Sequence, residues 1–178
     1  MNAPTTPLLF PELLGSGFGA LPPRVRMVHL RQGPQHLSGE VEVARGTRWL
    51  SRLCAWATRL PPAGKGPITV EIDATPGHER WTRHVASHAM PSRLWSRDGL
   101  LCERLGLVTF GFRLHAEDGA IVWRVERVRV FGLPLPKAWF DGVGARESEF
   151  DGRYHFDVAA SLPLAGLLVR YKGWLHVD

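Results

Sequence analysis

From residue 66 to the end of the chain, hydrophobic residues recur at every second position in short segments that end at turn signals. The clearest segment carries apolar side chains at Val108, Phe110, Phe112 and Leu114 and ends at the turn sequence Glu117-Asp118-Gly119. A period of two is typical of strands with one buried face, and an Asp-Gly turn joins two such strands into a hairpin. Because no helical segments separate these strands, the sequence predicts an antiparallel meander of eight or nine strands and argues against a parallel sheet.

One strongly amphipathic helix is predicted between Thr47 and Leu60. Its apolar residues recur at helical spacing and fall within a narrow arc of the helix surface: Trp49, Leu53, Trp56 and Leu60. Pro61 ends the helix, because a proline disfavours the α conformation of the residue before it. Two indoles bury of order 200 Å² each, so this stripe requires a concave apolar wall. Weaker helices are predicted over residues 10–21 and from Pro23 to about residue 31.

These elements predict an α+β fold. We expect the N-terminal helices and the amphipathic helix to pack against a strongly curved, mostly antiparallel meander, which is a half-barrel. The alternative is a closed, lipocalin-like β-barrel. Residues 1–9 are expected to form an N-terminal arm, and residues 10–178, in a chain that is 44% hydrophobic, a single domain.

The charge pattern limits the classes of partner. The net charge is +5, but the arginines are scattered and only Lys65, Lys137 and Lys172 among the 22 basic residues are lysine. Nucleic-acid binding is not expected, because such partners usually require a clustered basic patch. We expect no membrane span, no secretory signal and a cytoplasmic location, with Cys54 and Cys102 reduced. Whether the two thiols lie near each other stays open.

Two motifs resemble binding sites but lack the required context. Residues 15–20 match the letters G-x-G-x-x-A of a dinucleotide loop, yet no strand precedes them. His78, His84 and His88 share one parity, but strand residues six and four apart are separated by roughly 20 and 13 Å, which is too far for one metal ion. We therefore expect neither a cofactor nor a metal.

The candidates for a polar centre are carboxylates and arginines within otherwise apolar strands: Arg80, Glu103, Arg104, Glu147 and Glu149. Glu147 and Glu149 share a strand face, with side chains roughly 7 Å apart. On an inner face, two like charges would raise at least one pKa. On an outer face they form a solvated pair, and this is the interpretation that we favour.

The aromatic residues suggest a ligand cleft between helix and sheet. Its expected lining comprises Trp49, Trp56, Phe110, Phe112, Trp123, Phe156 and Trp174. Arg170, or Arg80, would meet an acidic head group. The favoured function is a non-catalytic binding module for a small apolar or amphipathic ligand. The alternatives are an enzyme of unassigned reaction that uses the clustered Glu and Arg residues, and a plain packed core.

Three stretches are distinctive: FGLPLP, ARES-x-x-DGR-x-x-FDV and YKGWL. Across residues 8–176 the chain resembles a bacterial family catalogued as a domain of unknown function. The resemblance implies a domain that occurs alone or is fused C-terminally to an NAD(P)-binding domain similar to saccharopine dehydrogenase. It therefore implies an accessory or interaction role beside an NAD(P)-dependent oxidoreductase, and it supplies no catalytic residue.

Overall fold

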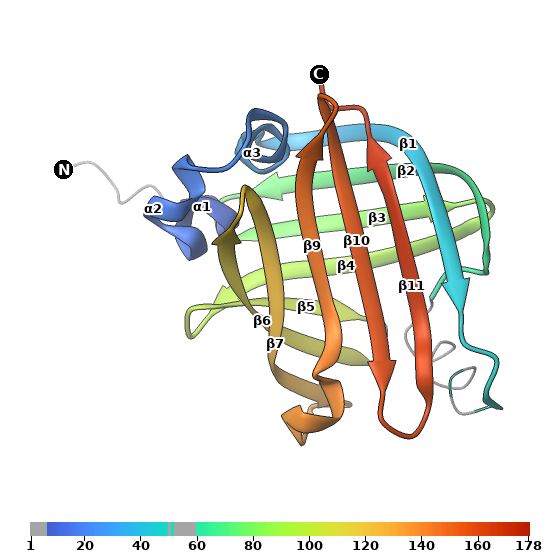
Figure 1. The fold of residues 1–178 in the computed structure, drawn as a ribbon. Coiled ribbons are helices and arrows are strands. Elements are labelled where there is room, and N and C mark those ends of the chain that lie inside the picture. Colours follow the sequence, from blue (N-terminus) through green and yellow to red (C-terminus); the bar gives the residue numbers. More distant parts are fainter. Residues whose placement is uncertain (1–6, 50, 52–59) are drawn as a thin grey trace.

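The computed structural model describes residues 7–49, 51 and 60–178. These residues form one antiparallel sheet in which the spatial order of strands is β6-β5-β4-β3-β2-β1-β11-β10-β9-β7-β8, and β6 also pairs with β7. The strands are β1 (Gly33–Arg45), β2 (Gly64–Thr75), β3 (His78–Val85), β4 (His88–Arg97), β5 (Leu100–Leu105), β6 (Val108–Glu117), β7 (Ala120–Val130), β8 (Leu133–Leu135), β9 (Gly142–Phe150), β10 (Arg153–Leu162) and β11 (Gly166–Leu175). The pairing of β6 with β7 closes ten strands into a barrel, and β8 is an extra strand beside β7 (Figure 1).

The expected α+β half-barrel is therefore wrong: the described residues are mostly β, and the sheet is closed, as the alternative expectation requires. Closure occurs at β7, which pairs with β6 along its length and with β9 from Ile121↔Glu147 to Arg124↔Gly144. The described part of the chain also contains more strands than the eight or nine expected. The open sheet and the closed barrel differ only in these long-range pairings, which the alternation of side chains does not specify.

Asp-Gly turns set the hairpins at one end of the barrel. Both residues of each pair have positive φ, which is the conformation of a type I′ turn: Asp98-Gly99, Asp118-Gly119 and Asp151-Gly152. The twist of this turn matches that of the strands it joins, so the local sequence fixes the register of three hairpins. The turn predicted at Glu117-Asp118-Gly119 is thereby confirmed.

Two glycines allow β1 and β11 to approach closely. A Cβ atom on Gly39 would lie 1.8 Å from the carbonyl oxygen of Trp174, and one on Gly173 would lie 2.0 Å from that of Glu40. No side chain fits at such distances, and glycine within a strand commonly marks a bend of a barrel. The β1–β11 pair is also the one that joins the first strand of the sheet to the last, so closure depends on it.

Three short helices cover one end of the barrel (Figure 1): α1 (Leu9–Leu14), α2 (Ser16–Gly19) and α3 (Pro23–Leu30). They match the helices predicted over residues 10–21 and 23–31, with Gly15 at φ 53° separating α1 from α2. Leu9, at the end of the expected arm, and Phe10 belong to α1, and both are fully buried. No helix in the described part of the chain has the length and apolar character needed to cross a membrane.

The other end of the barrel is its mouth. It is formed by the end of β1 and by the connections β3–β4, β5–β6, β7–β9 and β10–β11. A 3-10 helix, η1 (Lys137–Phe140), lies within the β7–β9 connection. The amphipathic helix predicted between Thr47 and Leu60 cannot be compared with the structure over most of its length, because residues 50 and 52–59, including Trp56 and Cys54, lie outside the described residues. Trp49 is described and is 77% exposed, so it does not belong to a buried stripe.

Candidate functional site

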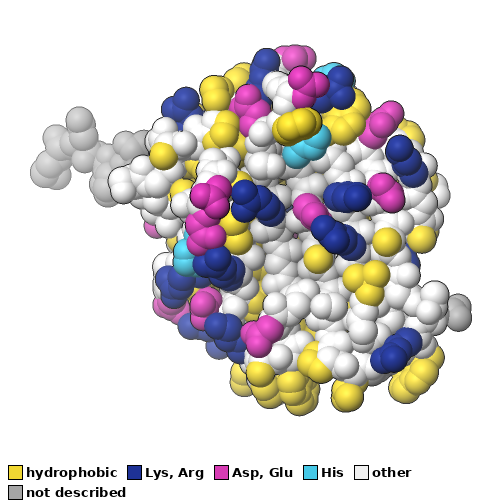
Figure 2. All heavy atoms as spheres, viewed as in Figure 1, with side chains coloured by type: hydrophobic (Ala, Val, Ile, Leu, Met, Phe, Trp, Pro, Cys, Tyr) yellow, Lys and Arg dark blue, Asp and Glu magenta, His cyan; other side chains and the backbone are white. Residues whose placement is uncertain are grey.

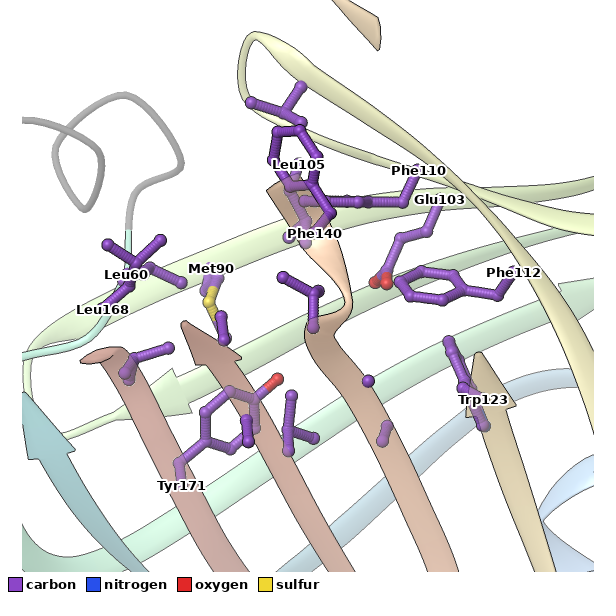
Figure 3. A pocket seen from close by; sticks show the side chains of 18 of the residues that line it. Leu60, Met90, Glu103, Leu105, Phe110, Phe112, Trp123, Phe140, Leu168 and Tyr171 are labelled. Atoms are coloured by element: carbon purple, nitrogen blue, oxygen red, sulfur yellow. The ribbon is translucent and has the colours of Figure 1, made fainter. Parts of the chain in front are cut away.

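The interior of the barrel holds a cavity of about 520 Å³. Its wall is built almost wholly from inward-facing apolar side chains of the strands, and toward the mouth from residues of the connections, including Leu60, Trp139, Phe140, Leu164 and Ala165. Figure 3 shows aromatic rings of β6 and β7 on one side and the ring of Tyr171 on the other. The cavity is therefore an apolar chamber that is closed by the helices at one end and bounded by the mouth at the other.

Small residues on β9, on β10 and in the β10–β11 turn leave this space. The cavity is lined by Gly144 and Ala145 of β9, Ala159 and Ala160 of β10, and Ala165 of the β10–β11 turn. Ala145 pairs with Trp123 of β7 on one side and with Val158 of β10 on the other. Large side chains at these positions would fill the chamber, so its volume depends on a few small residues between 144 and 165.

An arginine–glutamate pair lies in the cavity wall. Arg83 of β3 donates to the Glu103 carboxylate of β5 at 3.2 Å and to the Ser92 hydroxyl of β4 at 3.1 Å. Both charged side chains are about nine-tenths buried or more. Burial by itself lowers the pKa of Arg83, but Tyr171 and Glu103 outweigh it and the pKa is raised. The arginine therefore stays charged inside the barrel.

A second polar group is centred on Glu147 of β9. Its carboxylate lies 2.6 Å from Nε2 of His29, a fully buried histidine of α3 that stacks on Phe10 with ring centroids 3.6 Å apart. The hydroxyl of Tyr154 hydrogen-bonds to the same carboxylate. Glu147 and Tyr154 line the cavity, whereas His29 lies behind them. The cavity thus contains a carboxylate held from behind by an imidazole.

The two tyrosines of the chain both line the cavity. Burial is the main reason why the pKa of each is raised; the charge of Glu147 and the hydrogen bond to it raise that of Tyr154 further. Arg83 acts in the opposite direction on both hydroxyls. Figure 3 shows the Tyr171 hydroxyl and the Glu103 carboxylate directed into the chamber. These hydroxyls are neutral hydrogen-bonding groups at physiological pH.

Three buried polar atoms in or beside this network have no hydrogen-bond partner within the described structure. They are the indole Nε1 of Trp123, a residue of the cavity wall, Nδ1 of His29 and Oε1 of Glu79. The second oxygen of Glu79 accepts a hydrogen bond from the Trp81 indole at 2.7 Å. Burial raises the pKa of Glu79, and His29 and the Trp81 hydrogen bond reduce that effect. An unpaired indole donor in the wall is a group that a ligand acceptor would satisfy.

The described residues contain no group of three or more His, Cys, Asp or Glu side chains arranged to hold a metal ion. Cys102 is buried and not disulfide-bonded, and Cys54 lies outside the described residues. The titratable groups of the site are therefore carboxylates, tyrosines, one arginine and one histidine.

The structure places four of the predicted ligand-binding residues in the cavity wall: Phe110, Phe112, Trp123 and Phe156. Trp49 is on the surface near the mouth. Trp174 lies on the outside of the barrel, where the Arg153 guanidinium stacks over its ring at 4.3 Å. Arg170 is exposed and paired with Asp157 at 2.6 Å, so it does not reach the cavity. Trp56 lies outside the described residues.

Of the predicted polar centre, only Glu103 and Glu147 line the cavity. The outer-face interpretation is thus wrong for Glu147, which is 3% exposed. Glu149 accepts a hydrogen bond from the backbone N–H of Arg24 instead. Arg80 and Arg104 are exposed and point away from the chamber.

Sequence reasoning missed four residues of the site: His29, Arg83, Tyr154 and Tyr171. One signal was present for Arg83, because it shares its strand parity with the apolar residues Trp81 and Val85. A charged residue at a strand position where the alternation predicts a buried side chain indicates an internal site. No comparable signal exists for His29, whose partner is 118 residues away in sequence.

The chain belongs to the family described as "Domain of unknown function (DUF4166)", whose family model matches residues 21–175. No significant match to a curated protein was found. The family description assigns no activity. Fusion to a saccharopine-dehydrogenase-like domain, and with it the accessory role beside an oxidoreductase, stays a prediction from resemblance.

Proposed function

We propose that this member of the family binds a small amphipathic molecule inside the barrel. The observation that carries the proposal is the 520 Å³ chamber, which falls within the range of ligand pockets and has an apolar wall with a few convergent polar groups.

The polar groups favour a neutral or cationic ligand group. Arg83 is already paired with Glu103, and Glu147 is an additional carboxylate in the wall. An acidic group in the chamber would lie near the carboxylates of Glu103 and Glu147, whereas a hydroxyl, amide or amine would find both donors and acceptors. The expectation that Arg170 or Arg80 meets an acidic head group has no support, because both lie on the outer surface.

Binding is tested with N-phenyl-1-naphthylamine, a neutral apolar dye whose fluorescence rises in apolar surroundings. Ala145→Trp places an indole in the chamber, and Ala89→Trp, an exposed position on β4, is its matched control. We expect the wild type and Ala89→Trp to bind the dye equally and Ala145→Trp to bind at least about tenfold more weakly, because an occupied cavity loses its apolar contact area. Equal binding by folded Ala145→Trp would refute the proposal.

The natural ligand is sought by native mass spectrometry of the protein expressed in its own host. A co-purifying molecule should be retained by Ala89→Trp and missing from Ala145→Trp. A molecule that both variants retain is bound outside the chamber, and this outcome would contradict the proposal.

Glu147 supports a second candidate function, acid–base catalysis on the bound molecule. A carboxylate that faces a water-poor chamber and contacts an imidazole at 2.6 Å is an arrangement in which a proton can be accepted and returned. Glu147→Gln preserves the shape of the side chain but cannot accept the proton. If the molecule extracted from the protein changes mass on incubation with the wild type but not with Glu147→Gln, the enzyme hypothesis holds. If neither variant changes it, the binding module remains.

A further inference from the structure

Large apolar side chains project into solvent around the mouth of the barrel. Five of them are more than half exposed, and we call them the mouth patch: Trp49, Phe131, Leu133, Trp139 and Leu164. Among the large hydrophobic residues that the structure describes, only Leu30 and Phe150, both at the helix-covered end, are also more than half exposed. In Figure 2, apolar side chains gather along the lower edge, which is the mouth end in the orientation of Figure 1.

The mouth patch belongs to separate connections that surround one opening. Trp49 follows β1, Phe131 and Leu133 lie at the β7–β8 turn, Trp139 is in η1 and Leu164 is in the β10–β11 turn. Leu164 and Trp139 also contribute to the lining of the chamber. The exposed apolar surface is therefore continuous with the apolar interior.

The backbone conformation of Phe131 indicates that the exposure of its side chain serves a function. Phe131 has φ 51° and is followed by Gly132 at φ 82°, so the pair occupies a turn in which Asn-Gly or Asp-Gly is preferred. A bulky residue rarely adopts positive φ. Here it is held at the tip of the turn with 73% of its surface in water, where it stabilises no core. Local strain without a packing benefit is typical of a functional position.

The charged residues around the mouth are mostly basic. In the described segments 46–49, 60–66, 86–88, 104–107, 129–142 and 163–166, the exposed basic residues are Arg48, Lys65, Arg104, Arg129 and Lys137. Asp141 is the only acidic residue of these segments, and Glu126, just outside them, pairs with Lys137 at 3.3 Å. The turns at the opposite end carry acidic residues instead, among them Asp98, Asp118 and Asp151.

We propose that the mouth patch docks on the surface of an anionic phospholipid bilayer. Exposed aromatic and leucine side chains insert at the boundary between headgroups and acyl chains, and the surrounding basic residues are attracted to anionic headgroups. Symmetric docking of a second copy would bring the two basic rims together, which electrostatic repulsion opposes. The inference extends the proposed function, because a docked mouth lets an amphipathic molecule pass between bilayer and chamber without crossing water.

The test is flotation with vesicles of phosphatidylcholine, alone or mixed with phosphatidylserine. We expect binding only when phosphatidylserine is present. The triple variant Phe131→Ser, Trp139→Ser, Leu164→Ser should lose binding by at least about tenfold, since one inserted side chain contributes about a factor of ten. The matched control, Leu30→Ser with Phe150→Ser, removes equally exposed side chains from the other end and should bind as the wild type does.

Charge is tested separately with Lys65→Glu and Arg129→Glu, for which we expect about fivefold weaker binding for each basic charge removed. Arg113→Glu, an exposed position on the wall of the barrel, is the control and should have no effect. If Arg113→Glu weakens vesicle binding as much as Lys65→Glu or Arg129→Glu does, the vesicles are attracted by the net charge of the protein alone. That result would refute the proposed docking surface.

Docking and cavity binding fail in different ways. Ala145→Trp should float with anionic vesicles like the wild type while failing to bind the naphthylamine dye. If the wild type does not float, or if the triple serine variant floats unchanged, docking is refuted even when dye binding is intact. Docking on a bilayer is also refuted if, in the absence of lipid, the triple serine substitution abolishes dimerisation of the protein or its binding to a purified protein partner.

Discussion

Alkaline titration tests the buried polar network directly, because the only tyrosines in the chain, Tyr154 and Tyr171, both line the chamber. Burial is the first cause of the raised pKa of each, and that of Tyr154 lies well above its ordinary value because of the adjacent Glu147. A neutral phenol is therefore favoured in the folded barrel. In the unfolded chain the same groups lose their protons near pH 10.

The sign and size of the effect follow from proton linkage. Above pH 10 the unfolded chain binds fewer protons than the folded barrel, so the free energy of unfolding falls as the pH rises. Below pH 10 both states are protonated and the contribution is fully present. Each tyrosine reduces stability by about 1.4 kcal/mol per pH unit until its own folded pKa is reached.

The assay is phenolate absorbance, followed together with tryptophan fluorescence and circular dichroism. We expect phenolate to appear only when the other two signals report unfolding. Tyr154→Phe should cost about 1 kcal/mol at neutral pH, because a hydrogen bond to Glu147 is lost, and this deficit should shrink above pH 10. If phenolate forms near pH 10 while the barrel stays native, the tyrosines are not in the environment described above.

Three further predictions concern stability. Arg83→Met should cost about 3–5 kcal/mol in urea unfolding because it leaves Glu103 buried and unpaired, whereas the double variant with Glu103→Leu should be as stable as the wild type or more so; a double variant as unstable as the sum of the singles would contradict this. Glu79→Gln should be more stable than the wild type at pH 7 and equal to it below about pH 4, because burial raises the pKa of Glu79 and the stability present in acid is lost as the pH rises through that value; thermal unfolding at both pH values measures the difference. Gly39→Ala should lower the free energy of unfolding by about 1–3 kcal/mol or more because its Cβ meets a neighbouring carbonyl, while Gly66→Ala, which meets nothing, should change it little.

The strands and several turns could be predicted from sequence because their causes are local. The alternation in β6 assigns Phe110 and Phe112 to the inner face, and Asp118-Gly119 specifies the hairpin that follows. The same parity rule would have assigned Arg83 to the inner face. It was missed because the charged and histidine residues around it are typical of a solvated strand.

Closure could not be predicted in this way. Alternation states which side chains share a face, but a twisted open sheet and a barrel have the same alternation. The difference lies in the pairing of β1 with β11 and of β7 with β9, which joins segments far apart in the sequence. Gly39 and Gly173, which permit the first of these pairings, look in the sequence like ordinary weak points of a strand.

The chamber follows from the same long-range pairings. The width of a barrel grows with the number of its strands, and about eight strands enclose an interior that side chains just fill. Ten strands enclose a wider one. Phe110, Phe112 and Trp123 fill part of the additional width, but Ala145, which is paired with Trp123, and Ala160 of β10 leave the rest open. A ligand chamber therefore requires both the strand number, which is a property of the whole chain, and small residues on β9 and β10. The sequence shows those small residues, yet their meaning depends on the width of the barrel that contains them.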